Sequence, residues 1–492
     1  MSASESQTEA TEPPVARVAV KSIVWSGLSF GVTKVLVFIT TLLLARLLAP
    51  TDFGIVAAGL TIIAYLEIIL DLGIGAALIY EQEKGVSSRV HTAFTLNLGI
   101  CVTMFVIGWI SAPWLAEFFH TPGQENVYRA LFVFLILRGL GQIHDAILKR
   151  DLQYKRRAAV EISRGVTRVA VSVPMALMGF GVWSIVVGLL ASELCGTALN
   201  WLLVPYRPRI QLDRSTVPAL LRFGLAVTAL KVFAEIGTNS DYLVVGHRMG
   251  PTELGYYNLA FRIPEMVLSN AYWVFSSIAF PVYAKTRSSG QHDLGVTMLR
   301  VLRLSTLFGL TVGAVIALCA RDLVSAALGP HWQPIIVPLI ILSIAMGLQS
   351  IGYASGDIFP ALGRPGLLLA INTPLTFVLL AGFIIASYHG LAAVAAVHLG
   401  FTMVYGALRL IMGSRLTKTP LREAFTAMRP AVCATAGIVA LALPVRLFMP
   451  SGVLALVAIL LAAAVGGLAG LLLGGRDAIA ELRSVAAHAT AR

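Results

Sequence analysis

The sequence predicts an all-α polytopic membrane protein with fourteen transmembrane helices, and three observations lead to this prediction. Apolar residues make up 57% of the 492 residues and charged residues only 13%, about half of the roughly 25% typical of soluble domains. Apolar stretches of about 20 residues recur along the whole chain, separated by short segments rich in charge, Pro or Gly. Basic residues concentrate on one side of these stretches. The composition therefore excludes an ordinary soluble enzyme.

The predicted spans follow one another with connectors of at most about 15 residues, which are too short for a separate catalytic domain. The fourteen spans are residues 21–48, 53–80, 91–111, 127–148, 158–180, 182–204, 219–247, 255–283, 299–320, 332–354, 366–386, 391–412, 430–449 and 452–474. Residues 1–20 lack an apolar core, so we expect a disordered cytoplasmic tail there and not a cleavable signal. Residues 476–492 are predicted to form a second cytoplasmic tail.

The distribution of Lys and Arg tests this topology. If the N-terminus is cytoplasmic, most basic residues lie in cytoplasmic segments, and the opposite side holds only Arg46, Arg129, Arg248, Arg321 and Arg446. This bias predicts a plasma (inner) membrane protein with both termini in the cytoplasm, and it accounts for the net charge of +12 without nucleic acid. Four tryptophans near predicted outer ends are expected to form an aromatic belt; they are Trp109, Trp114, Trp183 and Trp332.

One turn motif occurs twice. Pro50-Thr51-Asp52-Phe53-Gly54 follows the first span, and Pro251-Thr252-Glu253-Leu254-Gly255 follows the seventh. Upstream residues match as well: Gly27 with Gly224, Lys34 with Lys231, and Arg46 with Arg248. We interpret the match as two parallel six-span repeats, residues 21–210 and 211–414, with two further spans at 415–475. The alternative is a good tight turn and helix start that recurs by chance.

Ionisable residues inside the spans are expensive, at roughly 3 kcal/mol each near the bilayer centre. The first, second, seventh and eighth spans carry eight of them: Lys34, Glu67, Asp71, Lys231, Glu235, Asp241, Arg262 and Glu265. Facing lipid, they would cost on the order of 25 kcal/mol together, so we expect them to face one another or water. Their placement on equivalent spans of the two repeats predicts a polar cavity between two lobes.

A second charged group lies on the fourth to sixth spans. It comprises Arg138, Asp145, Glu161, Arg164, Arg168 and Glu193. Several members lie within two turns of the basic cytoplasmic connector, which favours structural pairing or snorkelling over a functional role. The histidines have no metal-ligand spacing, the four cysteines lie far apart, and a Walker lysine loop is absent, so we expect no metal, disulfide, cofactor or ATP hydrolysis.

Four stretches of the sequence carry a family resemblance. They are the run from Leu44 to Gly54, Asp71-Leu72-Gly73, the run from Asp241 to Gly246, and the run from Leu254 to Ala260. Together they resemble the polysaccharide flippase branch, of the O-antigen and exopolysaccharide type, of the multidrug, oligosaccharidyl-lipid and polysaccharide exporter superfamily. The resemblance covers essentially the whole chain. It implies two six-helix lobes forming a V around a central cavity that is lined mainly by the first, second, seventh and eighth spans.

The resemblance also implies a non-enzymatic function. Such a protein would move an undecaprenyl-pyrophosphate-linked oligosaccharide from the cytoplasmic to the outer leaflet by alternating access, for lipopolysaccharide or exopolysaccharide biosynthesis. Its partners would be this substrate, membrane lipids, and a polymerase and glycosyltransferases of the same pathway. A coupling proton or sodium ion is the candidate cosubstrate.

This cargo needs cations for phosphate, polar groups and aromatic faces for sugar. The candidate cations are Lys34, Arg46, Lys231, Arg248 and Arg262. The candidate acids, which would balance those cations or bind the coupling ion, are Glu67, Asp71, Glu235, Asp241 and Glu265. The candidate sugar-stacking residues are Tyr65, Tyr242, Tyr256 and Tyr257, with Tyr272 and Trp273 beside them, and interfacial anchoring is the alternative for each.

Three other functions compete with this one. A lipid II flippase is a close relative with fourteen spans. A small-molecule cation antiporter of the same superfamily usually has twelve spans and an acidic cavity, whereas this interior is mixed. An integral-membrane glycosyltransferase or polymerase generally needs a sizeable loop outside the membrane, which the short connectors here do not provide.

Overall fold

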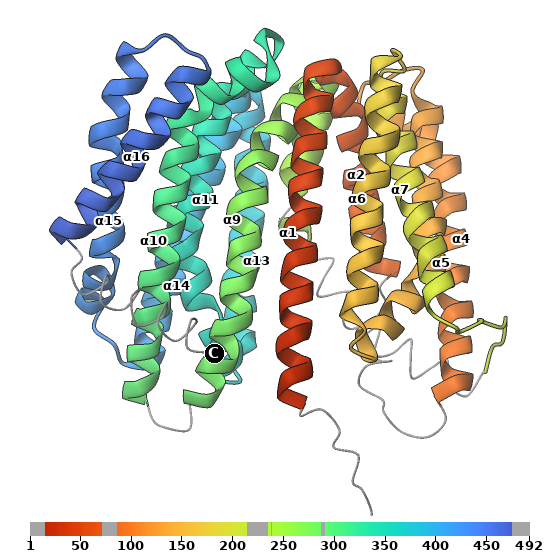
Figure 1. The fold of residues 1–492 in the computed structure, drawn as a ribbon, viewed down its shortest axis with the longest axis horizontal. Coiled ribbons are helices and arrows are strands. Elements are labelled where there is room, and N and C mark those ends of the chain that lie inside the picture. The colour runs from red at the N-terminus through yellow and green to blue at the C-terminus, as the bar shows by residue number, and fades with distance from the viewer. Residues whose placement is uncertain (1–14, 71–85, 214–234, 238, 287–290, 475–492) are drawn as a thin grey trace, which may run out of the picture. The chain divides into compact units, whose positions relative to one another are not determined.

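The computed structural model describes residues 15–70, 86–213, 235–237, 239–286 and 291–474, and these residues form helices without any β-strand (Figure 1). Helices are expected because a bilayer offers no water to unpaired backbone groups, so each span must satisfy its own hydrogen bonds. Ten helices in the described part of the chain are long and apolar enough to cross a membrane. The predicted all-α polytopic class is confirmed. The count of fourteen spans and their layout in two six-helix lobes stay predictions.

Most predicted span boundaries lie close to the ends of helices. Predicted spans 182–204, 366–386 and 452–474 correspond to α7 (Val182–Leu203), α13 (Pro365–Ala386) and α16 (Val453–Gly474). Three long helices, α1 (Val15–Leu47), α6 (Tyr154–Leu177) and α9 (Pro251–Thr286), are not among the ten candidate spans. In α6 and α9, polar and charged residues interrupt the apolar stretches. Parts of predicted spans 53–80 and 219–247 lie outside the described residues.

The chain divides into two compact units. Unit 1 comprises residues Met1–Leu44, Ile62–Leu115 and Gln124–Val232, and unit 2 comprises Ala45–Thr61, Ala116–Gly123 and Phe233–Arg492. The remaining helices of unit 1 are most of α1 (Val15–Leu47), the second half of α2 (Pro50–Leu70), α4 (Val86–Phe118) and α5 (Glu125–Arg150). Unit 2 adds α10 (Gln291–Leu323), α11 (Ile336–Gly356), α12 (Ile358–Ala361), α14 (Leu391–Thr417) and α15 (Leu421–Phe448).

Polar side chains hold the helices of unit 1 together. Asn97 on α4 donates a hydrogen bond to the Gly139 carbonyl of α5 at 3.0 Å. From α7, Thr197 and Trp201 donate to the carbonyls of Leu137 and Leu140 on α5, at 2.8 and 2.9 Å. Between membrane helices the hydrophobic effect is weak, so such bonds and close packing have to stabilise the bundle. They fix α4 and α7 on opposite sides of the same stretch of α5.

The extended connector after α7 lies along the start of α4. The backbone amides of Arg209, Gln211 and Asp213 donate to His91 Nδ1, Thr95 Oγ1 and Thr92 Oγ1 at 3.1, 3.0 and 3.1 Å. Burial raises the pKa of the Tyr206 hydroxyl to about 12. The hydroxyl therefore stays protonated, and its oxygen lies 2.7 Å from His91 Nδ1. Alternate amides of an extended chain point the same way, which explains why one helix can accept three of them.

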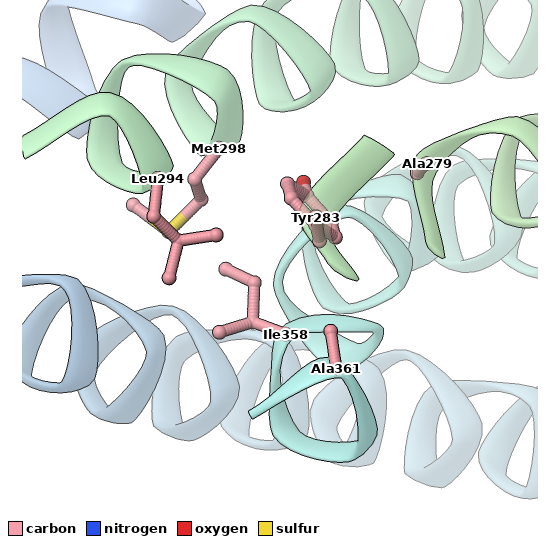
Figure 2. Packing of buried hydrophobic residues seen from close by; sticks show 6 residues of the cluster. All are labelled: Ala279, Tyr283, Leu294, Met298, Ile358 and Ala361. Atoms are coloured by element: carbon pink, nitrogen blue, oxygen red, sulfur yellow. The ribbon is translucent and has the colours of Figure 1, made fainter. Parts of the chain in front are cut away.

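In unit 2, the end of α9 packs against the start of α10 and against α12 (Figure 2). Tyr283 of α9 is fully buried beside Met298 of α10 and Ile358 of α12, and its hydroxyl donates to the Ala354 carbonyl of α11 at 2.9 Å. Burying a large aromatic ring together with a satisfied hydroxyl stabilises this corner. The cluster therefore joins four helices of unit 2 at one end.

Glycines set the closest helix contacts of unit 2. A Cβ on Gly313 of α10 would lie 2.7 Å from the Ser343 carbonyl oxygen of α11. Between α15 and α16, a Cβ on Gly437 would overlap the Gly466 carbonyl, and one on Gly466 would overlap the Gly437 carbonyl. Small residues at such crossings let two backbones approach closely. Figure 1 shows α15 and α16 side by side, as this contact requires.

Candidate functional site

A cluster of charged side chains joins four helices of unit 1. The Glu193 carboxylate of α7, with 5% of its side chain exposed, accepts from Arg164 Nη2 of α6 at 3.1 Å and from Arg138 Nη1 of α5 at 3.5 Å. Arg164 Nη1 also donates to Glu161 Oε1 at 3.1 Å, and Arg138 Nε lies 3.6 Å from Glu67 Oε1 of α2. We call these five residues the unit 1 charge cluster. It places three carboxylates and two guanidinium groups within helices that are otherwise largely apolar.

The local sequence makes this geometry possible. Glu161 and Arg164 are three residues apart, so they share a face of α6. Gly196 lies one turn after Glu193 on α7, and a Cβ there would overlap the Nε of Arg164. The glycine thus leaves the space into which the Arg164 guanidinium extends toward Glu193. Shared hydrogen bonds of this kind offset part of the cost of removing charges from water.

This cluster both confirms and extends the sequence interpretation. The predicted pairing within the second charged group is confirmed for Arg138, Glu161, Arg164 and Glu193. Asp145 pairs separately, with Lys149 at 2.7 Å and Arg157 at 3.0 Å. Glu67, which the sequence assigned to the other group, belongs to the unit 1 charge cluster. Two further candidates, Lys34 of α1 and Tyr65 of α2, lie half-buried in the same unit.

The two copies of the repeated turn meet inside unit 2. Helix α2 begins at Pro50 and α9 at Pro251, and the hydroxyl oxygens of Thr51 and Thr252 are 2.9 Å apart. A Cβ on Gly54 would overlap the Pro251 carbonyl oxygen, and a Cβ on Gly255 would overlap the Pro50 carbonyl oxygen. Only glycine permits this approach of the two backbones. The contact is reciprocal: the glycine of each turn lies against the proline of the other. A two-fold axis between two equivalent turns would produce such an arrangement.

Trp332 supports the same end of unit 2. Its indole is fully buried, and its Nε1–H donates to the Ala45 carbonyl at 2.6 Å. The ring packs edge-on against Phe53 and Tyr256, with centroids 5.4 and 5.8 Å away. The expectation that Trp332 belongs to an exposed aromatic belt is therefore wrong, because packing between the repeats covers the residue. Trp114, by contrast, has 69% of its surface exposed, as a belt residue would.

We expect Trp332→Phe to destabilise the protein by about 1–3 kcal/mol. The smaller phenyl ring leaves part of the buried space unfilled, and the Ala45 carbonyl loses the indole donor. The melting temperature of the purified protein in one detergent measures the effect. Trp114→Phe is the matched control, because that indole is exposed. Equal melting temperatures of the two variants would contradict the importance of this bond.

The remaining candidate cations in unit 2 are exposed. Arg248 donates to the Tyr388 hydroxyl, and its guanidinium carbon lies 4.8 Å from the centre of that ring. Arg46 is exposed on the last turn of α1, near the repeated-turn contact. Arg262 is exposed on α9. Lys231 lies outside the described residues, as does Asp71 among the acids.

The candidate acids of unit 2 differ in burial. Asp241 has 1% of its surface exposed, and its Oδ2 accepts from the Tyr257 hydroxyl at 2.8 Å. Glu235 accepts from Asn239, and Glu265 is half-buried on α9. Within the described ranges, no three His, Cys, Asp or Glu side chains are grouped so as to hold a metal ion.

The aromatic candidates also differ. Tyr257 is fully buried and Tyr242 is nearly fully buried. The two rings pack in a T-shaped arrangement, with centroids 5.6 Å apart. In this structure neither ring offers a face to a sugar, so stacking by Tyr242 and Tyr257 is not supported. Tyr272 is likewise buried, with its hydroxyl donating to the Met346 carbonyl at 2.7 Å. Tyr256 is half-buried and Trp273 is 72% exposed.

Comparison with known proteins gives a family match and several relatives. The profile of the family described as "Polysaccharide biosynthesis protein" matches residues 43–337. The chain is 28% identical over 300 residues to the succinoglycan biosynthesis transport protein ExoT of Rhizobium meliloti (strain 1021), and the match spans 60% of each chain, less than two thirds of ExoT. It is 24% identical over 390 residues to the lipopolysaccharide biosynthesis protein WzxC of Escherichia coli (strain K12), covering 77% of each chain.

Two solved structures share the fold. The lipid II flippase MurJ in an inward closed conformation matches 93% of this chain and all of its own, with a TM-score of 0.75 and 12% identity. An inward-facing multidrug resistance transporter of the MATE family, from the MOP superfamily, matches 80% of this chain and 95% of its own, with a TM-score of 0.67 and 16% identity. At these identities the likeness establishes the fold of the chain.

Proposed function

We propose that this chain, which belongs to the polysaccharide biosynthesis protein family, is a flippase for a lipid-linked oligosaccharide. In this proposal it moves an undecaprenyl-pyrophosphate-linked glycan from the cytoplasmic to the outer leaflet of the plasma membrane by alternating access. The glycan serves a cell-envelope polysaccharide such as lipopolysaccharide or exopolysaccharide. The chain is not an enzyme, and its relatives are named for transport and biosynthesis.

The unit 1 charge cluster is the observation that carries the proposal. Five ionisable side chains on α2, α5, α6 and α7 would be a large expense in a helix bundle that served only as an anchor. Charges inside a membrane protein typically face a pathway or a water-filled cavity. Arg138 and Glu67 fit such a role, because 44% and 38% of their side chains stay exposed while the partner Glu193 is buried.

We assign the remaining residues by their chemistry. The pyrophosphate would be attracted by Lys34 and Arg262, together with Lys231, which lies outside the described residues. The exposed Arg46 and Arg248 would attract it at the end of the helices where the repeated turns meet. Glu265 and Glu235, with Asp71, would balance those cations or bind the coupling ion, a proton or a sodium ion. Tyr65 and Tyr256 are the half-buried aromatic residues left to contact sugar.

The proposal includes the cellular context. Both termini would lie in the cytoplasm, consistent with the bias of basic residues. The substrate would come from glycosyltransferases on the cytoplasmic side, and a polymerase on the other side would use the translocated product. Membrane lipids surround the protein throughout.

Reconstitution tests the function directly. We expect proteoliposomes with the purified chain to move a fluorescent undecaprenyl-pyrophosphate oligosaccharide between leaflets, and Arg262→Ala to slow this movement at least tenfold. Arg422→Ala, at an exposed arginine on the first turn of α15, is the control and should behave like the unaltered protein. The measurement is the fraction of label that a membrane-impermeant quencher can reach over time.

The same assay separates the competing functions. Movement of lipid II in preference to the oligosaccharide carrier would replace the proposal with a peptidoglycan precursor flippase. Efflux of organic cations without lipid movement would favour an antiporter, and sugar polymerisation by the purified chain would establish an enzyme. Equal rates for the unaltered protein and Arg262→Ala would remove Arg262 from the site.

A further inference from the structure

Within the described part of unit 2, Arg409 forms no salt bridge with a carboxylate. Arg409 lies on α14, eight residues and about 12 Å before the end of that helix. Among the described residues, no carboxylate oxygen comes within 4.0 Å of its nitrogens. In the unit 1 charge cluster, both arginines have carboxylate partners. Arg409 therefore carries a positive charge without a direct ion pair among the described residues of unit 2.

The protein holds this guanidinium in a defined position. Its Nη1 donates to the Gly352 carbonyl of α11 at 3.2 Å, and its central carbon lies 4.5 Å from the centre of the Tyr405 ring. A Cβ on Gly356 would lie 2.9 Å from that carbon, so the glycine keeps the slot open. Tyr405 is fixed in turn, because its hydroxyl donates to Asn372 Oδ1 of α13 at 2.9 Å. Helices α11, α13 and α14 thus orient the guanidinium.

The hydrogen-bonding capacity of Arg409 is far from filled. A guanidinium has five N–H donors, and among the described residues only Nη1 of Arg409 has a hydrogen-bond acceptor. Its Nε is buried without a partner, while the residue as a whole keeps part of its surface accessible. An unpaired charge of this kind inside a membrane is costly unless an anion completes the site. The carboxylate of Asp357 accepts a hydrogen bond from the Ser276 hydroxyl at 2.9 Å and attracts Arg409 from beyond salt-bridge distance, so it compensates the charge of Arg409 only in part.

We propose that Arg409 is an anion-binding residue that takes a phosphate group of the lipid carrier, in a site formed by α11, α13 and α14 within unit 2. The proposal rests on the flippase function above and deepens it by adding a phosphate contact. A guanidinium offers paired, planar donors that match phosphate oxygens, and the Tyr405 ring next to it fixes the orientation of that plane. The glycine at position 356 leaves the room that this arrangement needs.

Binding of undecaprenyl pyrophosphate to the purified protein in zwitterionic nanodiscs tests the site. We expect Arg409→Gln to weaken binding at least about tenfold, as the loss of a charge-assisted contact would. Arg409→Lys keeps the charge but loses the planar fork, so it should weaken binding less than Arg409→Gln does. Arg422→Gln removes the same charge from an exposed position and should bind as the unaltered protein does.

Melting temperatures distinguish a ligand site from a structural clamp. If Arg409→Gln binds as tightly as the unaltered protein and only melts earlier, the residue is a clamp between α11 and α14 and the proposal is wrong. If Arg409→Gln fails to fold, Arg409→Lys is tested in its place. Unchanged affinity of Arg409→Lys for the carrier would show that the proposal is wrong. Weakened affinity with an unchanged melting temperature would support it. Failure of the unaltered protein to bind the carrier would overturn the proposed function as well.

Discussion

Replacing Glu193 with alanine is expected to abolish transport and to destabilise the protein by about 3–5 kcal/mol, the cost of breaking a buried ion pair on one side. The carboxylate is almost completely buried and accepts from both Arg138 and Arg164. Its removal leaves Arg164, itself mostly buried, with the partly exposed Glu161 as its one salt-bridge partner in the described part of the chain. Two positive charges in neighbouring membrane helices then repel each other where α5, α6 and α7 converge.

The effect is measured as a loss of thermal stability and as the rate of lipid-linked oligosaccharide movement in proteoliposomes. Glu161→Ala is the matched control, because Glu161 is more exposed and, within the described residues, forms a salt bridge with Arg164 alone. It should cost about 1 kcal/mol or less, as a partly exposed pair usually does. Similar losses for Glu193→Ala and Glu161→Ala would show that Glu193 does not hold the cluster together.

The sequence could predict the parts of this cluster that follow from spacing along one helix. Glu161 and Arg164 are three residues apart on α6, and the pair forms as expected. The contacts of Glu193 with Arg138 and Arg164 depend on how three helices cross, and a hydropathy pattern contains no such information. The contact of Glu67 with Arg138 was accordingly not predicted. The position of Arg409 cannot be predicted from the sequence for the same reason: its contacts with Gly352 of α11 and its lack of a salt bridge among the described residues depend on how the helices pack.

A tryptophan's position near a predicted membrane boundary predicted its exposure correctly in one case and wrongly in another. Trp114 and Trp332 both lie near predicted outer ends, yet only Trp114 is exposed. Trp332 is covered because the segment around Ala45 and Phe53 packs over it. The repeated turn gave a stronger signal. Matching Pro, Thr and Gly residues in two places predicted equivalent structures, and the structure places the two copies against each other.

A disulfide between cysteines at positions 51 and 252 is expected to stop transport almost completely, and reduction should restore it. The hydroxyl oxygens of Thr51 and Thr252 are 2.9 Å apart, so two thiols there would lie close enough to be oxidised. Alternating access requires the cavity to open to each side of the membrane in turn, and contacts between the repeats at a closed end must then break once per cycle. The glycines beside the threonines make this contact close enough to serve as such a closure.

The assay compares Thr51→Cys/Thr252→Cys with each single variant, before oxidation, after oxidation and after reduction. The native cysteines Cys101, Cys195, Cys319 and Cys433 are free, so the unaltered protein treated with the same oxidant is the further control. Only the double variant should lose transport on oxidation. Full transport by the crosslinked protein would mean that the two turns stay together throughout the cycle. The reciprocal glycine contact would then be a fixed pivot between the repeats, and opening would have to occur elsewhere.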